Sequence, residues 1–168
     1  TGRGFFLPRS TTAEPGPGNC EGKRNESRFR VKGEDEVLRI ALPNKGRLAD
    51  QTLTLFEKAG LKAESRVERA LMGNLGQGFQ AIFVRAQDIP EFVADGAAAL
   101  GVTGADLVTE AGEPVDELLD LGFGRCHLAV AVRDDSPVQR PRDLPDGTRV
   151  ATAFPRVTAE YFRGLGLE

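Results

Sequence analysis

The sequence predicts an α/β fold with a mainly parallel sheet, and two stretches of the chain carry this prediction. Residues 81–107 contain a short apolar run, an amphipathic segment and a second apolar run. Residues 37–60 contain a strand pattern, a basic turn and a helix pattern. A strand, a helix and a strand within this length form a parallel βαβ unit, because parallel strands need a crossover connection. In such sheets ligands bind at the carboxyl ends of the strands.

The stretch 81–107 contains the clearest helix start. Residues 81–85 predict a short buried strand. Asp88 is expected to cap the helix, with Glu91 as its reciprocal partner and Pro90 in the first turn, where no amide donor is missed. The helix is expected to end at Gly101, before the next strand at 102–104. One apolar face is predicted from spacings of three and four: Ile89, Phe92, Val93, Ala97 and Leu100.

The segment 37–60 predicts a strand ending at Pro43, a turn at 44–47, and a helix closed by Gly60. A basic turn before a helix is suited to binding an anion, because the free amides and the helix dipole add to the charges of Lys45 and Arg47. The alternative is a solvated turn whose basic side chains point into water, and spacing alone favours that alternative.

Further elements are expected along the rest of the chain. We expect strands at 63–67 and 69–72, a helix at 105–111, strands at 126–133 and 148–155, and a helix at 157–164. Residues 1–36 mix Gly, Pro, Ser, Arg and Glu without a period. They are therefore expected to be a disordered or extraneous extension outside the sheet.

The composition of the 168-residue chain narrows the function. With 40% hydrophobic residues, 28% charged residues and a net charge of −3, it is typical of a globular protein without a nucleic-acid surface. No apolar run approaches the length of a membrane span. Cys20 and Cys126 are expected to be reduced thiols in a cytoplasmic protein, and no Cys/His cluster has zinc spacing.

The residues best suited to binding a ligand lie in basic turns and at glycine-rich strand ends. They are residues 45–47, Arg85 and residues 104–106. Such groups suit a phosphorylated ligand, because cationic side chains and backbone amides bind phosphates. No Walker loop, dinucleotide fingerprint or nucleophile elbow is present. These features predict a phosphate-bearing ligand and assign no catalytic residue.

Four segments together resemble ATP phosphoribosyltransferase, the first enzyme of histidine biosynthesis. They are LRIALPNKGRL (38–48), VRAQDIPEFVADGAAALGVTGADLV (84–108), LGFGRCHLAVAV (121–132) and RVATAFP (149–155). The resemblance implies a periplasmic-binding-protein-like (type II) α/β core with two catalytic domains and a cleft between them. Residues 37–103 would form part of the first domain and residues 104–168 part of the second.

The resemblance also implies a glycosyltransferase reaction. N1 of the adenine of ATP attacks C1 of phosphoribosyl pyrophosphate, and pyrophosphate leaves with Mg²⁺. Matching the family's motifs residue by residue implies seven substrate-binding positions and no protein metal ligand: Lys45, Gly46, Arg47, Arg85, Gly104, Asp106 and Leu107. A homo-oligomer in the full-length enzyme is implied, as is a histidyl-tRNA-synthetase-like regulatory subunit if the chain is of the short form.

The sequence departs from the family in three places. Ala99 stands where an Asp is usual, and Ala86 and Gln87 fill a stretch that is often more charged. The family's phosphoribosyl-pyrophosphate loop is expected soon after Glu168, so the core is expected to be incomplete at its C-terminus and inactive alone. Two other interpretations stay open: a non-catalytic ligand-binding module of the same fold, suggested by residues 143–155, and a fragment without activity.

Overall fold

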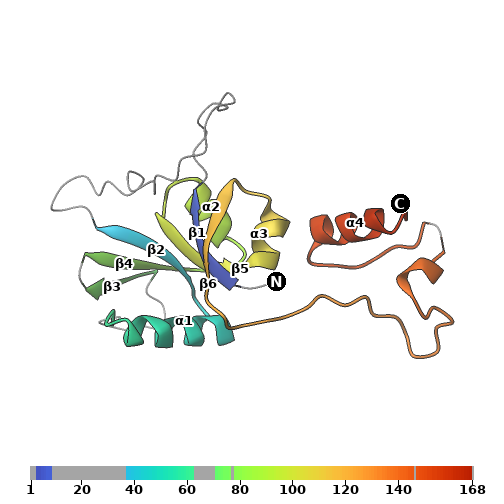
Figure 1. The fold of residues 1–168 in the computed structure, drawn as a ribbon, viewed down its shortest axis with the longest axis horizontal. Helices are drawn as coiled ribbons and strands as arrows, with labels where there is room; N and C mark the ends of the chain where they lie inside the picture. The colour runs from blue at the N-terminus through green and yellow to red at the C-terminus, as the bar shows by residue number, and fades with distance from the viewer. Residues whose placement is uncertain (1–2, 9–36, 63–70, 77, 146, 168) are drawn as a thin grey trace, which may run out of the picture.

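A six-stranded sheet with the order β3-β4-β2-β5-β1-β6 forms the body of the protein (Figure 1). The computed structural model describes residues 3–8, 37–62, 71–76, 78–145 and 147–167. No helix in these ranges is long and apolar enough to cross a lipid bilayer. The elements are β1 (Arg3–Pro8), β2 (Leu38–Pro43), α1 (Arg47–Lys58), β3 (Met72–Gly76), β4 (Phe79–Val84), α2 (Ile89–Ala94), β5 (Leu100–Gly104), α3 (Ala105–Ala111), β6 (Val115–Asp120), η1 (Pro141–Asp143) and α4 (Pro155–Gly164).

β2 lies at the centre of the parallel part of the sheet. It pairs in parallel with β4 along its whole length, from Leu38 opposite Phe79 to Pro43 opposite Val84. On its other side it pairs in parallel with β5. Since β4, α2 and β5 follow one another in the chain, they form the βαβ unit that the sequence predicts. β3 adds to the outer edge of β4 as an antiparallel hairpin.

Helices cover both faces of this sheet, with α1 on one side and α2 and α3 on the other (Figure 1). The α1 side is filled by one cluster of buried side chains: Ile40, Leu42, Phe56, Leu75, Ala81 and Val102. The opposite side is filled by a second cluster: Ala41, Ile82, Ile89, Val93, Ala98 and Val115. Successive residues of a strand point to opposite faces, so β2 contributes to both clusters.

β1 corrects the prediction that all of residues 1–36 lie outside the sheet. Arg3–Pro8 pairs antiparallel with β5 on one side and with β6 on the other. These pairings satisfy backbone groups of β5 and β6 that would otherwise form open strand edges. The six residues of β1, RGFFLP, show no alternation of apolar and polar residues, which is why the sequence did not reveal this strand. Residues 9–36 lie outside the described residues.

α2 is shorter than predicted, because it ends at Ala94 rather than at Gly101. Gly96 adopts φ 74°, a left-handed conformation that stops a helix and that glycine adopts without strain. The amide of Gly96 donates to the carbonyl of Val93, and the amide of Ala98 donates to that of Phe92. The chain therefore turns six residues earlier and enters β5 at Leu100, which belongs to the strand.

Two strands were also predicted between α1 and β4, and the structure describes only one of them. The strand expected at 63–67 lies outside the described residues, as do Arg66 and Arg69. The strand expected at 69–72 appears later, as β3 from Met72. β3 pairs antiparallel with β4, the next strand along the chain, and two glycines, Gly73 and Gly76, lie within it.

The C-terminal segment contains the clearest failure of the strand predictions. Residues 126–133 and 148–154 are in no strand, although both have strand patterns. A strand needs a neighbouring backbone to bond to, and no described strand pairs with either stretch. The predicted helix is confirmed as α4, which starts two residues earlier, at Pro155.

Helix α4 is joined to the body through α3. Both carboxylate oxygens of Glu110 accept hydrogen bonds at the start of α4, from the amides of Arg156 and Val157, each at 3.0 Å. These amides have no partner within their own helix, and a carboxylate also interacts favourably with the positive end of the helix dipole. The contact fixes α4 beside α3 (Figure 1).

The close approach of α2 to β5 yields a first prediction. A Cβ atom at Gly101 would lie 2.5 Å from Cγ2 of Ile89 and 2.8 Å from Cγ2 of Val93, both fully buried. Gly101→Ala should therefore lower the free energy of unfolding by about 1–3 kcal/mol, measured by urea denaturation. Gly164→Ala is the control, since nothing lies within 4 Å of a Cβ atom there. Equal stability of the two variants would contradict this account of the packing.

Candidate functional site

The carboxyl ends of three adjacent parallel strands meet at one edge of the sheet. β4 ends at Val84, β2 at Pro43 and β5 at Gly104, in the spatial order β4-β2-β5. All seven positions that the sequence suggested for substrate binding lie at or just after these strand ends, in the two loops, at the last residue of β5 and in the first turns of α1 and α3. The parallel pairing therefore brings three distant parts of the chain to the place where α/β sheets bind ligands.

The middle loop is the basic turn before α1. The amide of Asn44 donates to the carbonyl of Val84 at 2.8 Å, which ties this loop to the end of β4. Gly46 has φ 86°, a conformation that side-chain-bearing residues rarely adopt, and it is the N-cap of α1. Lys45 and Arg47 on either side of it are exposed. The turn thus presents two cationic side chains at the positive end of a twelve-residue helix.

Arg85 lies in the loop after β4 and forms an ion pair that corrects a sequence prediction. Its Nε donates to Oδ2 of Asp88 at 2.8 Å. Asp88 occupies the N-cap position of α2 but makes no side-chain cap hydrogen bond, so the predicted reciprocal capping with Glu91 is wrong. The carboxylate is engaged by a cation instead. The Arg85 side chain remains 65% exposed, so it is accessible to a dissolved anion.

A part-buried hydrogen bond joins the loop after β4 to strand β5 across the end of β2. The hydroxyl of Thr103, which is fully buried, donates to the carbonyl oxygen of Ala86 at 2.6 Å. The loop after β4 is thereby held next to the end of β5. Neither residue was among the predicted site residues, because the sequence gives no sign of a contact between them.

The third strand, β5, leads directly into α3 without a loop. Gly104 is buried at the N-cap position of α3, and Asp106 and Leu107 lie half-buried in its first turn. The start of α3 has no side-chain cap hydrogen bond, so the carboxylate of Asp106 does not cap this helix. Its Oδ2 lies 3.6 Å from Sγ of Cys126, an exposed thiol that sequence reasoning did not connect with the site.

Lys45, Arg47, Arg85 and Asp106 therefore lie at one sheet edge, three of them cationic and one acidic. No group of three or more His, Cys, Asp or Glu side chains that could bind a metal ion occurs among the described residues. An apolar cavity of about 410 Å³ lies elsewhere, between α4 and residues 144–150, and includes none of these side chains. The sheet edge is the part of the structure with the chemistry for an anionic ligand.

Comparison with known proteins places the chain in a family. Residues 85–168 match the family profile described as HisG, ATP phosphoribosyltransferase. A protein of that name from Gemmatimonas aurantiaca is 58% identical over 134 residues, which is 78% of this chain. The chain belongs to the ATP phosphoribosyltransferase family. Another relative of that name, from Methanosarcina acetivorans, is 49% identical over 135 residues.

The chain spans about half the length of the curated relatives it matches. The match covers 46% of the Gemmatimonas protein and 46% of the Methanosarcina protein. More than half of each relative therefore lies outside the match.

A solved structure confirms the fold expected for an ATP phosphoribosyltransferase. The ATP phosphoribosyl transferase (HisG:HisZ) complex from Thermotoga maritima contains a chain with a TM-score of 0.53 and 25% sequence identity. The match covers 78% of this chain and 61% of that one. The expected α/β fold of the periplasmic-binding-protein-like type is confirmed, whereas the domain boundary at 103 and 104 stays a prediction. In the structure β6 continues the same sheet beyond that boundary.

The hydrogen bond between Thr103 and Ala86 generates a second prediction. Thr103→Val keeps the shape of the side chain but leaves the Ala86 carbonyl without its donor. The free energy of unfolding should fall by about 1–3 kcal/mol, and amide exchange in residues 85–88 should become faster. Thr109→Val is the matched control, because that exposed hydroxyl bonds only within α3 and should change stability by less than about 0.5 kcal/mol. Unchanged exchange in residues 85–88 would show that the bond does not position this loop.

Proposed function

We propose that this chain supplies the nucleotide-binding part of an ATP phosphoribosyltransferase. The observation that carries the proposal is the convergence of the basic turn 44–47, Arg85 and Asp106 at the carboxyl edge of the sheet, in a chain of this family. The reaction joins ATP to phosphoribosyl pyrophosphate. The bond from adenine N1 to C1 of the ribose forms, the bond from C1 to the pyrophosphate oxygen breaks, and the electron pair leaves with pyrophosphate.

We assign the residues at this edge of the sheet to different groups of the nucleotide. Lys45, Arg47 and Arg85 bind phosphate oxygens, because charge-assisted hydrogen bonds from cationic side chains are among the strongest polar contacts. The backbone around Gly46 and Gly104 lets phosphate or ribose approach closely, since neither residue has a side chain. The carboxylate of Asp106 accepts hydrogen bonds from an amino or hydroxyl group of the nucleotide. These contacts orient ATP, and orientation of reactants lowers the barrier of a two-substrate reaction.

Mg²⁺ enters this proposal as a companion of the phosphate-bearing substrates. Magnesium is usually held by one or two carboxylates together with substrate phosphates and water. In this proposal the substrate phosphates and water would hold the ion, since Asp106 is assigned to the nucleotide and Asp88 is engaged by Arg85. When bound, the ion neutralises charge that develops on the leaving pyrophosphate.

The assembly and location of the active enzyme are part of the same proposal. The Thermotoga structure is a HisG:HisZ complex, which supports a regulatory subunit of the histidyl-tRNA-synthetase-like kind for this chain. We also propose a homo-oligomeric enzyme that works in the cytoplasm in histidine biosynthesis.

Binding of ATP tests the site directly. Arg85→Ala should weaken ATP binding roughly tenfold to a hundredfold, the range expected when about 1.5–3 kcal/mol of charged hydrogen bonding is lost. The measurement is isothermal titration calorimetry on the 168-residue chain. Arg39→Ala is the matched control, since Arg39 is an exposed arginine near the opposite end of β2. Equal losses in the two variants would mean that ATP does not bind at the carboxyl edge.

Turnover tests the function as a whole. The 168-residue chain should show no phosphoribosyl transfer, because the part of the relatives outside the match is needed to position the second substrate. A fusion of this chain to the unmatched part of the Gemmatimonas enzyme should form phosphoribosyl-ATP from ATP, phosphoribosyl pyrophosphate and Mg²⁺. Equal turnover by the two polypeptides would contradict this placement of the active site. ATP binding without turnover in the fusion would favour a ligand-binding module.

A further inference from the structure

The ion pair between Arg85 and Asp88 is built on a turn whose backbone is held from two directions. The amide of Asp88 donates to the carbonyl of Arg85 at 2.9 Å, which closes the turn and brings the two residues together. Between them, the carbonyl of Ala86 accepts the hydrogen bond from the hydroxyl of Thr103 at 2.6 Å, which attaches the turn to β5. Both charged side chains therefore start from a fixed backbone.

Asp88 does not cap the helix that it precedes. It occupies the N-cap position of α2 with φ −89° and ψ −14°, a helical conformation, whereas a capping residue usually has an extended backbone. A capping side chain accepts from the amide of the second or third helical residue, and the second one here is Pro90, which has no amide hydrogen. Capping is thus disfavoured at this position, and the carboxylate accepts from Nε of Arg85 instead.

The geometry of the pair leaves the outer part of the guanidinium for a ligand. The hydrogen bond to Asp88 uses Nε, and the two Nη groups of Arg85 bond to no other described residue. The Arg85 side chain is 65% exposed, while that of Asp88 is only 27% exposed. A guanidinium is planar, so a bond at Nε restricts the orientation of the whole group and leaves the Nη donors for phosphate oxygens.

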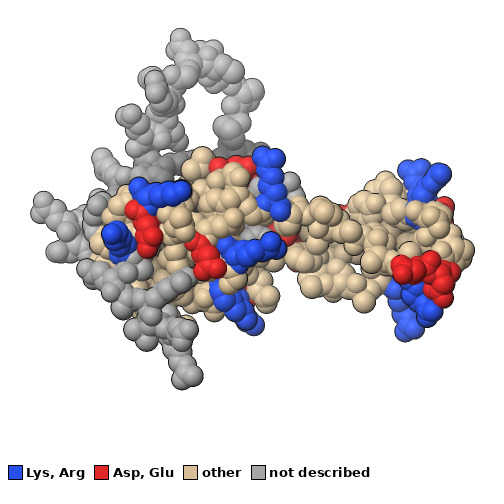
Figure 2. Space-filling view, turned by 90° about the horizontal axis from the view of Figure 1, so that it is seen from below, with Lys and Arg blue, Asp and Glu red and all other residues tan. Residues whose placement is uncertain are grey.

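The charge on the rest of the molecule gives little general attraction for an anion. The chain has a net charge of −3. On the face of the body seen in Figure 2, Lys and Arg side chains are interspersed with Asp and Glu side chains and form no unbroken basic patch. Binding of a phosphate therefore depends on a few well-oriented cationic groups more than on a broad positive field.

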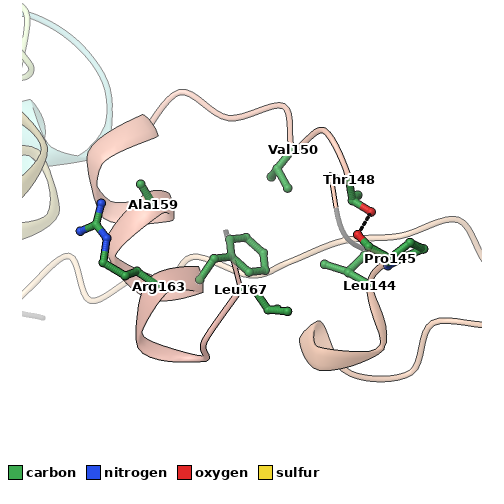
Figure 3. A pocket seen from close by; sticks show the side chains of 8 residues that line it. Leu144, Pro145, Thr148, Val150, Ala159, Arg163 and Leu167 are labelled. Atoms are coloured by element: carbon green, nitrogen blue, oxygen red, sulfur yellow. Dashed lines mark hydrogen bonds between the residues drawn. The ribbon is translucent and has the colours of Figure 1, made fainter.

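The apolar cavity beside α4 is not a second phosphate site. Among the described residues that line it, only Arg163 is charged. Figure 3 shows the guanidinium of Arg163 pointing away from the apolar side chains of Leu144 and Val150. A phosphate in this cavity would lose its hydration without gaining a cationic partner, which is unfavourable. The carboxyl edge of the sheet remains the place where the orientation of an arginine matters.

We propose that Asp88 is a positioning residue, which holds the guanidinium of Arg85 in the orientation that binds a phosphate group. This rests on the proposed function, in which Arg85 binds phosphate. A free arginine side chain has many rotamers and loses them when it binds a ligand. Asp88 restricts Arg85 before the ligand arrives, so part of that entropy is lost on folding and less is lost on binding.

Asp88 acts on a bound phosphate in two ways that have opposite signs. Its negative charge repels the phosphate, but this charge is balanced by Arg85 and screened by water and salt, since the pair is partly exposed. Its hydrogen bond orients Arg85 and favours binding. The orienting effect outweighs the repulsion, so removal of the negative charge weakens phosphate binding, which is the reverse of what repulsion alone would give.

Asp88→Asn tests the sign of this effect. Asparagine has nearly the same shape and is an equally good residue at an N-cap position, so α2 should be preserved. The affinities of the 168-residue chain for ATP and for tripolyphosphate, measured by isothermal titration calorimetry, should both fall about threefold to tenfold. In an Arg85→Ala background, Asp88→Asn should cause no further loss, because the group that it orients is gone.

Asp135→Asn is the matched control. Asp135 accepts from Nε and Nη2 of Arg133 at 2.9 and 2.7 Å, in a pair that lies after β6 and outside the sheet. Its removal should leave both affinities unchanged. Urea denaturation of the two variants completes the comparison, and each should lose only a small and similar amount of stability, since each breaks one partly exposed ion pair.

Several results would overturn the positioning role of Asp88. They are tighter or unchanged binding in Asp88→Asn, an equal loss of affinity in the Arg85→Ala background, and a large loss of stability in Asp88→Asn alone, which would make Asp88 a structural residue. If Arg85→Ala weakens ATP binding while Asp88→Asn does not, the proposed function stands and this inference fails. If tripolyphosphate follows the expected pattern but ATP binding does not depend on Arg85, the positioning role stands and the nucleotide assignment fails.

Discussion

β2 hydrogen-bonds in parallel to β4 on one side and to β5 on the other, and the remaining structure is arranged around this double pairing. It requires crossover helices, which cover the two faces and create the two buried clusters. It also aligns the ends of three strands, so that loops distant in sequence come together. A disturbance of β2 would therefore affect both the core and the candidate site.

The parts of the fold that depend on local chemistry were predictable from the sequence. The basic turn 44–47, the helix after it and the βαβ unit follow from strand and helix patterns and from Pro90 and Gly60. The convergence of the loops followed from parallel topology alone. The role of Asp88 was not predictable, because helix capping and pairing with Arg85 are both available to an aspartate at that position. The bond from Thr103 to Ala86 depends on tertiary placement, for which no local pattern exists.

The C-terminal segment shows why a strand pattern and a strand differ. The alternation at 126–133 indicates that one row of side chains is suited to burial on the face of a sheet, which is a property of the sequence. A ladder also needs a second backbone, and no described strand of this chain provides one there. α4 does form, since the hydrogen bonds of a helix lie within one segment and Glu110 supplies its missing acceptors. The sequence patterns therefore predicted the helix correctly, because a helix needs no second segment. They also predicted strands at places where no described strand is available to pair with them.

The direction of β1 affects how the protein can be handled. Arg3 pairs with Gly104 at the carboxyl end of β5, so the chain enters the sheet at the same edge that carries the basic turn, Arg85 and Asp106. Anything fused ahead of Arg3 would emerge beside those groups. An amino-terminal affinity tag rich in histidine would place extra imidazoles next to a site suited to phosphates and would compete with Lys45 and Arg47 for them. A carboxyl-terminal tag follows α4 and avoids that edge.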